Sequence, residues 1–490
     1  MSSIEDDDDS SRSFRFLLPN VGDTEEVERY ESGGFHPVHL GDLFDEGRYR
    51  VVHKLGAGGF ATIWLARDLL ESSWVALKIV LAEESQSVEA SATLAHNIVP
   101  ESFHDSRFVT YERYFHIEGP NGRHLCLVLP VLGPSAYRVS HYLESRIQPR
   151  LARNVALQAA EALADLHSRG LCHGDLTPAN IMFRIKDFDH VSEDEIYDLL
   201  GRPETGPLET ESGEPAGPEA PGYIVKTLDF LKARRPIISE AICLIDFDNA
   251  FLASSPPEKL LPTPVEYLAP EVAAGLSGGK ASDIWALGCS ILRLRSGEGL
   301  FSAYDIGSPV DLLVAIHRFL GKMPTAWGNP VFDSEGRPRK TFSKGVQLSG
   351  LTDQVTERQS IEGWIKKIFD QPGTGPYRPK DQVSNTEEHP FYNPHEVSHA
   401  SFYAWKFWEP SAINFRGKYF RGYNHEWHAL VDELPKISNE EAGLLFDLIS
   451  KILVYEPTER SAAREILDHP WFHIDDVSEH VVDKELKGEV

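Results

Sequence analysis

The alternation of apolar and polar residues becomes regular at Tyr49 and predicts a strand-rich region that extends to residue 133. The segment YRVVHKL, which begins at Tyr49, alternates as a strand does, and WVALKIV, which ends at Val80, is a second strand. HLCLVLPV, from His124, predicts a further strand that runs into a glycine-proline bend. A short helix is expected between these strands, over residues 87–95.

Apolar residues at helical spacing characterise the chain beyond residue 134. A helix is predicted over residues 149–169, and Gly170 can end it. Its apolar face comprises Leu151, Val155, Ala159, Ala162, Leu163 and Leu166. A buried helix is expected from Asp283, and another opens at Ser438, where Glu441 suggests a capping box.

Five segments lack a regular pattern. Residues 1–32 are polar and acidic, and we expect them to be disordered, whereas residues 33–48 resemble an extended arm packed on the domain. Residues 186–240 form an acidic insert rich in proline and glycine, which we interpret as a solvated loop. Residues 330–435 form an irregular insert, and residues 474–490 form a charged C-terminal tail.

Two short segments, LCHGDLTPANIMF (171–183) and ICLIDFDNA (242–250), place a polar centre between apolar flanks. Their polar residues are Asp175, Asn180 and Asp246, which strand edges can present to one cleft. This set suits phosphoryl transfer: one aspartate accepts the proton of the attacking hydroxyl, and the asparagine and second aspartate hold Mg²⁺. The alternative is that these residues only make hydrogen bonds within turns. That alternative accounts for either segment alone more easily than for the two segments together.

A glycine turn and a lysine on the following strand predict a phosphate-binding element. Backbone N–H groups in such a turn can approach phosphates closely, and Lys78 would pair with the α- and β-phosphates. A carboxylate must hold this lysine, and Glu89 is preferred over Glu83 and Glu84. The expected nucleotide-binding residues are Leu55, Gly56, Ala57, Gly58, Gly59, Lys78 and Glu89.

Composition restricts the partners. The 490-residue chain has a formal net charge of −27 and a pI near 5.2, which argues against direct binding of nucleic acid. The charge would favour a basic peptide partner, and solubility alone explains it equally well. The four cysteines sit in apolar surroundings without metal-ligand spacing, which fits buried reduced thiols in an intracellular protein. The sequence contains no apolar run long enough to cross a membrane, and we expect a monomer in the cytoplasm and/or nucleus.

These motifs resemble a eukaryotic protein kinase over residues 49–472. The glycine loop, VALK, HGDLTPAN, DFD, APE, DIWALG and a late Arg460 follow one another in the order of that family. FHPVHLGDLF ahead of the domain and GFATIWLARD in the glycine loop are similar to the SR-protein kinases, which phosphorylate serines in arginine–serine repeats. The resemblance implies an α+β, bilobal protein-kinase fold, with a small β-rich N-lobe at 49–133 and a larger, mainly helical C-lobe at 134–473.

The resemblance also implies roles for individual residues. Asp175 would be the catalytic base, supported by Lys78 and Asn180, while Asn180 and Asp246 would bind Mg²⁺ with ATP as phosphoryl donor. Asp283 would stabilise the catalytic loop. Glu271 and Arg460 would form the buried ion pair of the large lobe.

Five positions depart from the family pattern. Ala61 replaces the third loop glycine, and Gly174 replaces the arginine that clamps a phosphorylated activation loop, which argues against activation by loop phosphorylation. Thr177 replaces a lysine that touches the γ-phosphate. Asp248 replaces a glycine that tolerates positive φ, and Leu268 replaces an arginine of the substrate loop.

The sequence therefore predicts a serine/threonine protein kinase that acts on basic, Arg/Ser-type proteins. Two alternatives stay open. HGD and IDFD also resemble the aminoglycoside and choline phosphotransferases, although VEYLAPEV and DIWALGC are elements of a protein-kinase peptide platform. Thr177 and Asp248 motivate the second alternative, a pseudokinase scaffold. Against it, the chain keeps the ionic groups for catalysis, namely Lys78, Asp175, Asn180 and Asp246.

Overall fold

The computed structural model describes most of the chain. The described residues are 14–17, 20–22, 24–99, 106–140, 147–186, 188, 190–301, 306–339, 345–368 and 436–474. They form two compact units, the first of residues 1–90, 111–131 and 188–229, and the second of the remaining residues. None of the helices formed by the described residues is long and apolar enough to cross a membrane.

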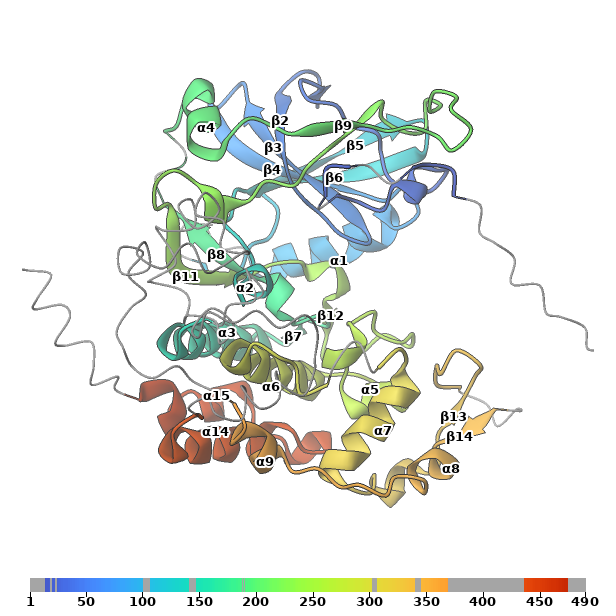
Figure 1. Ribbon diagram of the computed structural model, residues 1–490, viewed down its shortest axis with the longest axis vertical. Helices are drawn as coiled ribbons and strands as arrows, with labels where there is room; N and C mark the ends of the chain where they lie inside the picture. The colour runs from blue at the N-terminus through green and yellow to red at the C-terminus, as the bar shows by residue number, and fades with distance from the viewer. Residues whose placement is uncertain are drawn as a thin grey trace, which may run out of the picture. The chain divides into compact units, whose positions relative to one another are not determined.

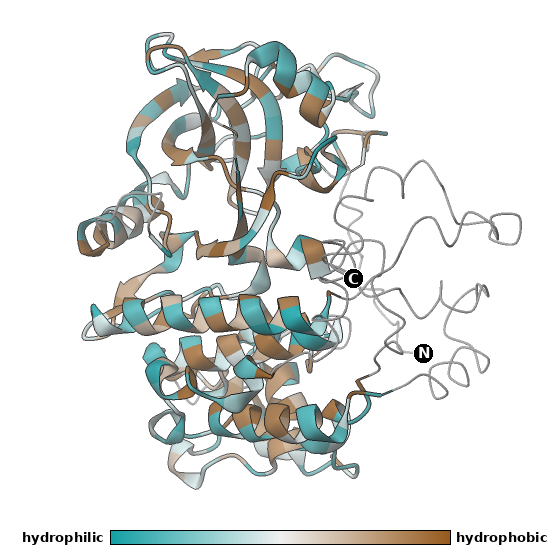
Figure 2. Ribbon diagram, turned by 90° about the vertical axis from the view of Figure 1, so that its left-hand side faces the viewer, coloured by the Kyte–Doolittle hydropathy of each residue, from teal (hydrophilic) through white to brown (hydrophobic). Residues whose placement is uncertain are grey.

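The first unit is built on a six-stranded antiparallel sheet with the order β1-β2-β3-β4-β6-β5 (Figure 1). Its strands are β1 (Leu43–Phe44), β2 (Tyr49–Ala57), β3 (Ala61–Asp68), β4 (Ser73–Val80), β5 (Arg113–Gly119) and β6 (Gly122–Pro130). Figure 2 shows apolar and polar residues interspersed along the strands of this unit, and β4 and most of β6 are almost continuously buried. One face packs a core that includes Val51, Trp64, Leu77, Cys126 and Val128.

The expected glycine-turn hairpin is present, but its second strand differs from the predicted one. The turn joins β2 to β3, so the segment WVALKIV is a third strand, β4, whose Lys78 lies opposite Ile63 of β3. Strand β3 was not predicted, because its segment ATIWLARD follows directly on the glycines. The predicted helix at 87–95 is present as α1 (Ser85–Ile98).

The expected disorder of residues 1–32 is wrong for residues 24–32. Residues Val27–Arg29 form the 3-10 helix η1, and Val27 and Tyr30 are buried against Phe35 and Leu81. Sequence polarity did not reveal this order, because the core that holds these residues also includes distant residues such as Leu81 and Leu208. Residues 1–13 lie outside the described part.

The acidic insert is also ordered where the structure describes it, and residues 188–229 belong to the first unit rather than forming a solvated loop. It contains α4 (Glu193–Leu200), β9 (Thr205–Pro207) and β10 (Tyr223–Val225). Trp74 donates from Nε1 to the carbonyl of Val191 at 2.7 Å, and the Tyr223 hydroxyl accepts from the N–H of Leu40 at 3.0 Å. A carboxylate of the insert also takes part, because Glu193 of α4 pairs with Arg50 of β2. The acidic composition by itself did not indicate these partners.

The second unit is mainly helical. Its longest helices are α3 (Pro149–Ser168), α6 (Lys280–Ser296), α7 (Pro309–Leu320) and α14 (Asn439–Ile452). Its shorter helices are α2 (Ala136–Ser140), α5 (Pro270–Ala273), α8 (Leu348–Thr352), α9 (Ile361–Ile365) and α15 (Ala463–Ile466). Its 3-10 turns are η3 (Pro178–Asn180), η4 (Phe230–Lys232), η5 (Phe247–Asn249), η6 (Val265–Tyr267), η7 (Thr325–Trp327), η9 (Pro457–Glu459) and η10 (Pro470–His473). Three two-stranded ladders complete it, formed by β7 (Leu171–Cys172) with β12 (Phe251–Leu252), β8 (Ile181–Ile185) with β11 (Ile238–Leu244), and β13 (Val331–Phe332) with β14 (Val346–Gln347).

The predicted helix at 149–169 is confirmed as α3, whose six apolar positions are all buried, and it packs against α6. The predicted capping box of α14 is only half formed. Ser438 accepts from the N–H of Glu441, but the Glu441 carboxylate binds the guanidinium of Arg295 at 2.7 and 2.8 Å instead of returning to the cap. A buried arginine is a stronger partner for a carboxylate than an exposed N–H.

Candidate active site

Two antiparallel ladders of the second unit bring the predicted polar segments together. β7 pairs with β12 through Cys172 and Phe251, and β8 pairs with β11 through Ile181 and Leu244. The four residues are buried, as expected for apolar residues that flank a polar loop. The loops at 173–180 and 245–250 therefore run beside each other. The first of them is the catalytic loop that the resemblance implies, and the name is used below for residues 173–180.

Asn180 holds Asp175 in place. Its side-chain amide donates from Nδ2 to the backbone carbonyl of Asp175 at 2.8 Å and to Asp175 Oδ2 at 3.1 Å. Asn180 ends η3, which begins at Pro178, and Thr177 is extended, as residues before proline prefer. The amide thus fixes one carboxylate oxygen of Asp175, and a carboxylate held in this way can accept a proton from a hydroxyl group.

Asp246 lies next to this pair. The N–H of Ile245 donates to the carbonyl of Asn180 at 3.1 Å, which brings the following residue beside the catalytic loop. Asp246 itself has φ 66°, in the left-handed region, at the N-terminus of η5. The backbone strain expected at Asp248 is therefore found at Asp246, because Asp248 lies within a 3-10 turn.

Asp283 fixes the start of the catalytic loop, as the resemblance implies. It accepts from the backbone N–H of His173 at 2.8 Å and of Gly174 at 2.9 Å. His167 of α3 contacts the same carboxylate, Nε2 to Oδ2, at 2.9 Å. The Asp283 side chain is buried, so these charge-assisted bonds act in an environment of low dielectric constant.

His173 is a positioning residue that the sequence motifs did not single out. Its Nε2 lies 3.0 Å from the carbonyl oxygen of Ile245, and its Nδ1 accepts from the backbone N–H of Asp175 at 3.3 Å. These bonds define the Nε2–H tautomer. Burial holds the pKa of His173 below its ordinary value, against the opposing charge of Asp283, so the neutral ring is favoured. In the sequence, the feature that could have identified His173 is its position two residues before Asp175, in the segment CHGD.

Gly174 occupies a position that excludes a side chain. Its φ is +78°, and a Cβ there would lie 2.4 Å from the carbonyl oxygen of Asn249. Its own carbonyl accepts from the hydroxyl of Thr263 at 2.7 Å. An arginine is therefore sterically incompatible with this loop, which gives a structural reason for the departure from the family pattern.

The predicted pair of Glu271 and Arg460 is confirmed. Two parallel bonds join the guanidinium to the carboxylate at 2.9 and 2.6 Å, and both side chains are buried. Ser282 at the start of α6 donates to Glu271 as well, at 2.9 Å. Leu268, in place of a substrate-loop arginine, is buried at the end of η6.

The glycine turn of the first unit is open. A Cβ added to Gly56, Gly58 or Gly59 would meet no atom within 4 Å, and none of the three has positive φ. The fold itself therefore does not require glycine here, whereas the close approach of a nucleotide phosphate would. The turn, with Leu55 and Ala57 beside these glycines, fits the predicted role.

Lys78 is buried on β4, in the middle of the sheet, between Ile63 of β3 and Leu127 of β6. Two of the three candidate carboxylates have other contacts. Glu89 Oε2 lies 3.1 Å from His116 Nε2, and Glu83 Oε1 accepts from Arg29 at 3.0 Å. The pairing of Lys78 with Glu89 stays a prediction.

The residues that would hold magnesium are Asn180 and Asp246. Mg²⁺ is bound in such sites through one or two protein oxygens together with substrate phosphates and water, so the donor set fits. Among the described residues no group of three or more His, Cys, Asp or Glu could hold a metal ion. The four cysteines are free and buried, as predicted.

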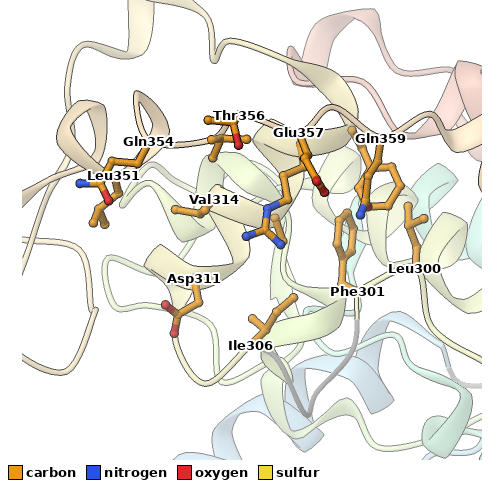
Figure 3. A pocket seen from close by; sticks show the side chains of 14 residues that line it. Leu300, Phe301, Ile306, Asp311, Val314, Leu351, Gln354, Thr356, Glu357 and Gln359 are labelled. Atoms are coloured by element: carbon orange, nitrogen blue, oxygen red, sulfur yellow. The ribbon is translucent and has the colours of Figure 1, made fainter. Parts of the chain in front are cut away.

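A separate cavity of about 650 Å³ lies between α7 and residues 351–359 of the second unit (Figure 3). Its walls combine the apolar side chains of Phe301 and Val314 with the carboxylates of Asp311 and Glu357. None of its lining residues belongs to the catalytic loop.

Comparisons with known proteins agree with this geometry. The protein kinase domain family matches residues 49–195. A solved structure of a kinase domain has a TM-score of 0.51 and 18% identity, and the match covers 89% of this chain and 98% of that one. The kinase fold expected from the sequence is therefore confirmed.

Curated relatives extend the match. The chain is 24% identical to serine/threonine-protein kinase AFC1 of Arabidopsis thaliana, over 90% of this chain and 74% of that protein. It is 28% identical to serine/threonine-protein kinase SRPK of Physarum polycephalum, over 68% and 82%. It is 33% identical to SRSF protein kinase 3 of Homo sapiens, over 33% of this chain and 30% of the human protein. The chain therefore carries a protein kinase domain, and the proteins it is similar to are named as serine/threonine kinases, SRPK and SRSF protein kinase 3 among them.

Proposed function

We propose that this kinase transfers the γ-phosphoryl group of ATP to serine residues of basic, Arg/Ser-type proteins in the cytoplasm or nucleus. The observation that carries the chemical part is the hydrogen bond from Asn180 to Asp175 Oδ2, within a loop that Asp283 fixes. Preorganised acceptors of this kind lower the cost of reaching the transition state.

Each residue has a defined part in the proposed reaction. The serine oxygen forms a bond to the γ-phosphorus, the bond from that phosphorus to the bridging β–γ oxygen breaks, and ADP leaves. Asp175 takes the hydroxyl proton. Lys78, held by Glu89, pairs with the α- and β-phosphates, and the glycine turn covers them. Magnesium, held by Asn180 and Asp246, would neutralise phosphate charge.

Two observations support a basic substrate. The net charge of −27 attracts cationic peptides over a distance set by the Debye length, about 8–10 Å at physiological salt. Two relatives are named SRPK and SRSF protein kinase 3. Added salt should therefore raise the KM for an Arg-Ser peptide more than the KM for a neutral peptide.

The decisive experiment supplies labelled ATP and magnesium with three acceptors: an Arg-Ser repeat peptide, a neutral serine peptide and an aminoglycoside or choline. Asp175→Asn, which preserves the side-chain shape, serves as the inactive variant. Asp165→Asn, in a partly exposed pair with Arg169 on α3, serves as the matched control. The expected result is label on the Arg-Ser peptide with the wild type and Asp165→Asn, and loss of about 10²–10⁴-fold in Asp175→Asn.

Other outcomes identify the alternatives. Label on the small molecule would replace the substrate class and keep the chemistry. Bound nucleotide without label on any acceptor would favour a pseudokinase scaffold. In that case Thr177→Lys and Asp248→Gly are the reversions to make, because these positions depart from the family pattern.

A further inference from the structure

The segment of residues 24–32, called the N-terminal arm below and distinct from the extended arm at 33–48, is anchored on the sheet by a buried ion pair. Lys54 of β2 donates from Nζ to Glu25, and the two side chains are 0% and 1% exposed. The Tyr30 hydroxyl donates to the other Glu25 oxygen at 2.5 Å. Release of the arm would leave a buried lysine without this partner, so the segment from Glu25 to Tyr30 is held firmly.

From this anchored segment the side chain of Arg29 reaches the glycine turn. Nη1 donates to the backbone carbonyl of Gly59, and Nη2 donates to Glu83 Oε1 at 3.0 Å. The carbonyl of Arg29 accepts from the N–H of Phe35 at 2.9 Å, and the guanidinium lies 5.7 Å from the centre of the Phe35 ring. One side chain thus joins the glycine turn to the segment that links β4 to α1.

The bond to Gly59 has a defined consequence for the turn. A trans peptide is planar, with its carbonyl and the following N–H pointing in opposite directions. Fixing the carbonyl of Gly59 therefore also fixes the direction of the N–H of Phe60. Glycines lose more conformational freedom than other residues when they are ordered, and no atom lies within 4 Å of where a Cβ would stand on the glycines of this turn. The turn consequently benefits from an anchor outside itself.

We propose that Arg29 is a positioning residue that holds the glycine turn in the conformation that receives the phosphates of ATP. This inference rests on the proposed function, because it names a further residue that supports the same nucleotide site. Arg29 acts through the peptide that joins Gly59 to Phe60. The N-terminal arm therefore contributes to nucleotide affinity through Arg29.

Binding of Mg-ATP and of adenosine to the full chain, measured by titration calorimetry, tests the proposal. Arg29→Gln should raise the Kd for Mg-ATP and the KM for ATP about five- to tenfold, with little change in kcat and in the Kd for adenosine. Arg29→Lys keeps the charge and one donor at a time and should recover part of the loss. Arg15→Gln is the matched control, because Arg15 pairs with Glu28 of the same arm at an exposed position.

The outcomes separate the inference from the function on which it rests. Equal weakening of Mg-ATP and adenosine in Arg29→Gln would show general support of the unit and overturn the inference. Unchanged Mg-ATP affinity would overturn it as well. Wild-type protein that does not bind Mg-ATP would overturn the proposed function, and the inference with it.

A second variant guards against a folding defect. Glu83→Gln alters only the exposed partner of Arg29 and should raise the Kd for Mg-ATP about twofold, because the guanidinium keeps its bond to Gly59. Hydrogen exchange at the N–H of Phe60 should speed up in Arg29→Gln and stay unchanged in Arg15→Gln. An unchanged exchange rate in Arg29→Gln would contradict the proposed anchoring.

Discussion

A Cβ at Gly174 would lie 2.4 Å from the carbonyl oxygen of Asn249, in a loop where Gly174 has φ +78°. Gly174, which precedes the proposed catalytic base Asp175, thus lies close to the backbone of Asn249. The two polar segments of the site meet at this point through backbone atoms. Any side chain at Gly174 would push the two segments apart.

Gly174→Arg should therefore impair both stability and activity. Positive φ costs a non-glycine residue about 1–3 kcal/mol, and the contact with Asn249 adds to this loss. Gly170→Ala is the matched control, since Gly170 has φ +80° but no atom within 4 Å of a Cβ position. Urea unfolding and peptide phosphorylation measure the two effects. Equal loss of stability in both variants would contradict a steric role for Asn249.

Asn180→Asp should shift the acid limb of the pH profile. The new carboxylate would face Asp175 Oδ2, which the amide now reaches at 3.1 Å, and a like charge so close raises the pKa of an aspartate. In a plot of kcat/KM against pH, the acid limb should therefore move to higher pH by about one unit. Asn154→Asp on α3, which makes the same charge change beside Gln158, should leave the profile in place. A common shift in both variants would point to overall charge instead.

Arg460→Ala should destabilise the second unit. Breaking a buried pair by removal of one partner costs about 3–5 kcal/mol, because the charge of Glu271 is left in the interior. Lys366→Ala, which removes an exposed pair with Glu362, should cost less than about 1 kcal/mol. Chemical unfolding of both variants measures the contrast. A loss below about 1 kcal/mol for Arg460→Ala would show that the interior relaxes around Glu271.

The free energy of unfolding should fall as the pH drops below 6.5. Burial lowers the pKa of His36 and of His53 from 6.5 to about 4, with His124 adding to the effect at His36. The unfolded chain therefore binds more protons than the folded one between these values, so stability rises with pH across this window. Each ring contributes up to about 3 kcal/mol.

Unfolding in urea at pH 7 and at pH 5.5 tests this expectation. His53→Gln should reduce the difference in stability between the two pH values, whereas His190→Gln, at an exposed residue, should not. An undiminished difference in His53→Gln would mean that other groups dominate the acid response.

Much of the site was predictable because its chemistry is local. Asp175 and Asn180 lie five residues apart in one loop, and the apolar segments around them are strands that pair with those around Asp246. Helix α3 was predictable for the same reason, since its buried face follows a 3.6-residue period. Roles such as catalytic base or magnesium ligand stay predictions until activity is measured.

Other features depend on contacts between residues far apart in the chain. The partners of Glu441 are arginines such as Arg295, and the partner of Glu83 is Arg29. Neither pairing follows from spacing, because any cation within reach could satisfy a carboxylate. The positive φ of Asp246, which the family pattern places at Asp248, likewise reflects how the 3-10 turn is closed.

The sequence by itself determined which residues can carry out phosphoryl transfer and which segments form strands and helices, because side-chain chemistry and periodicity are properties of short stretches. Only the tertiary structure decided that the acidic insert packs with the first unit, that the arm around Arg29 joins the glycine turn, and that Gly174 excludes an arginine. Those features arise where distant segments meet, and their energies depend on burial and geometry that no local pattern encodes.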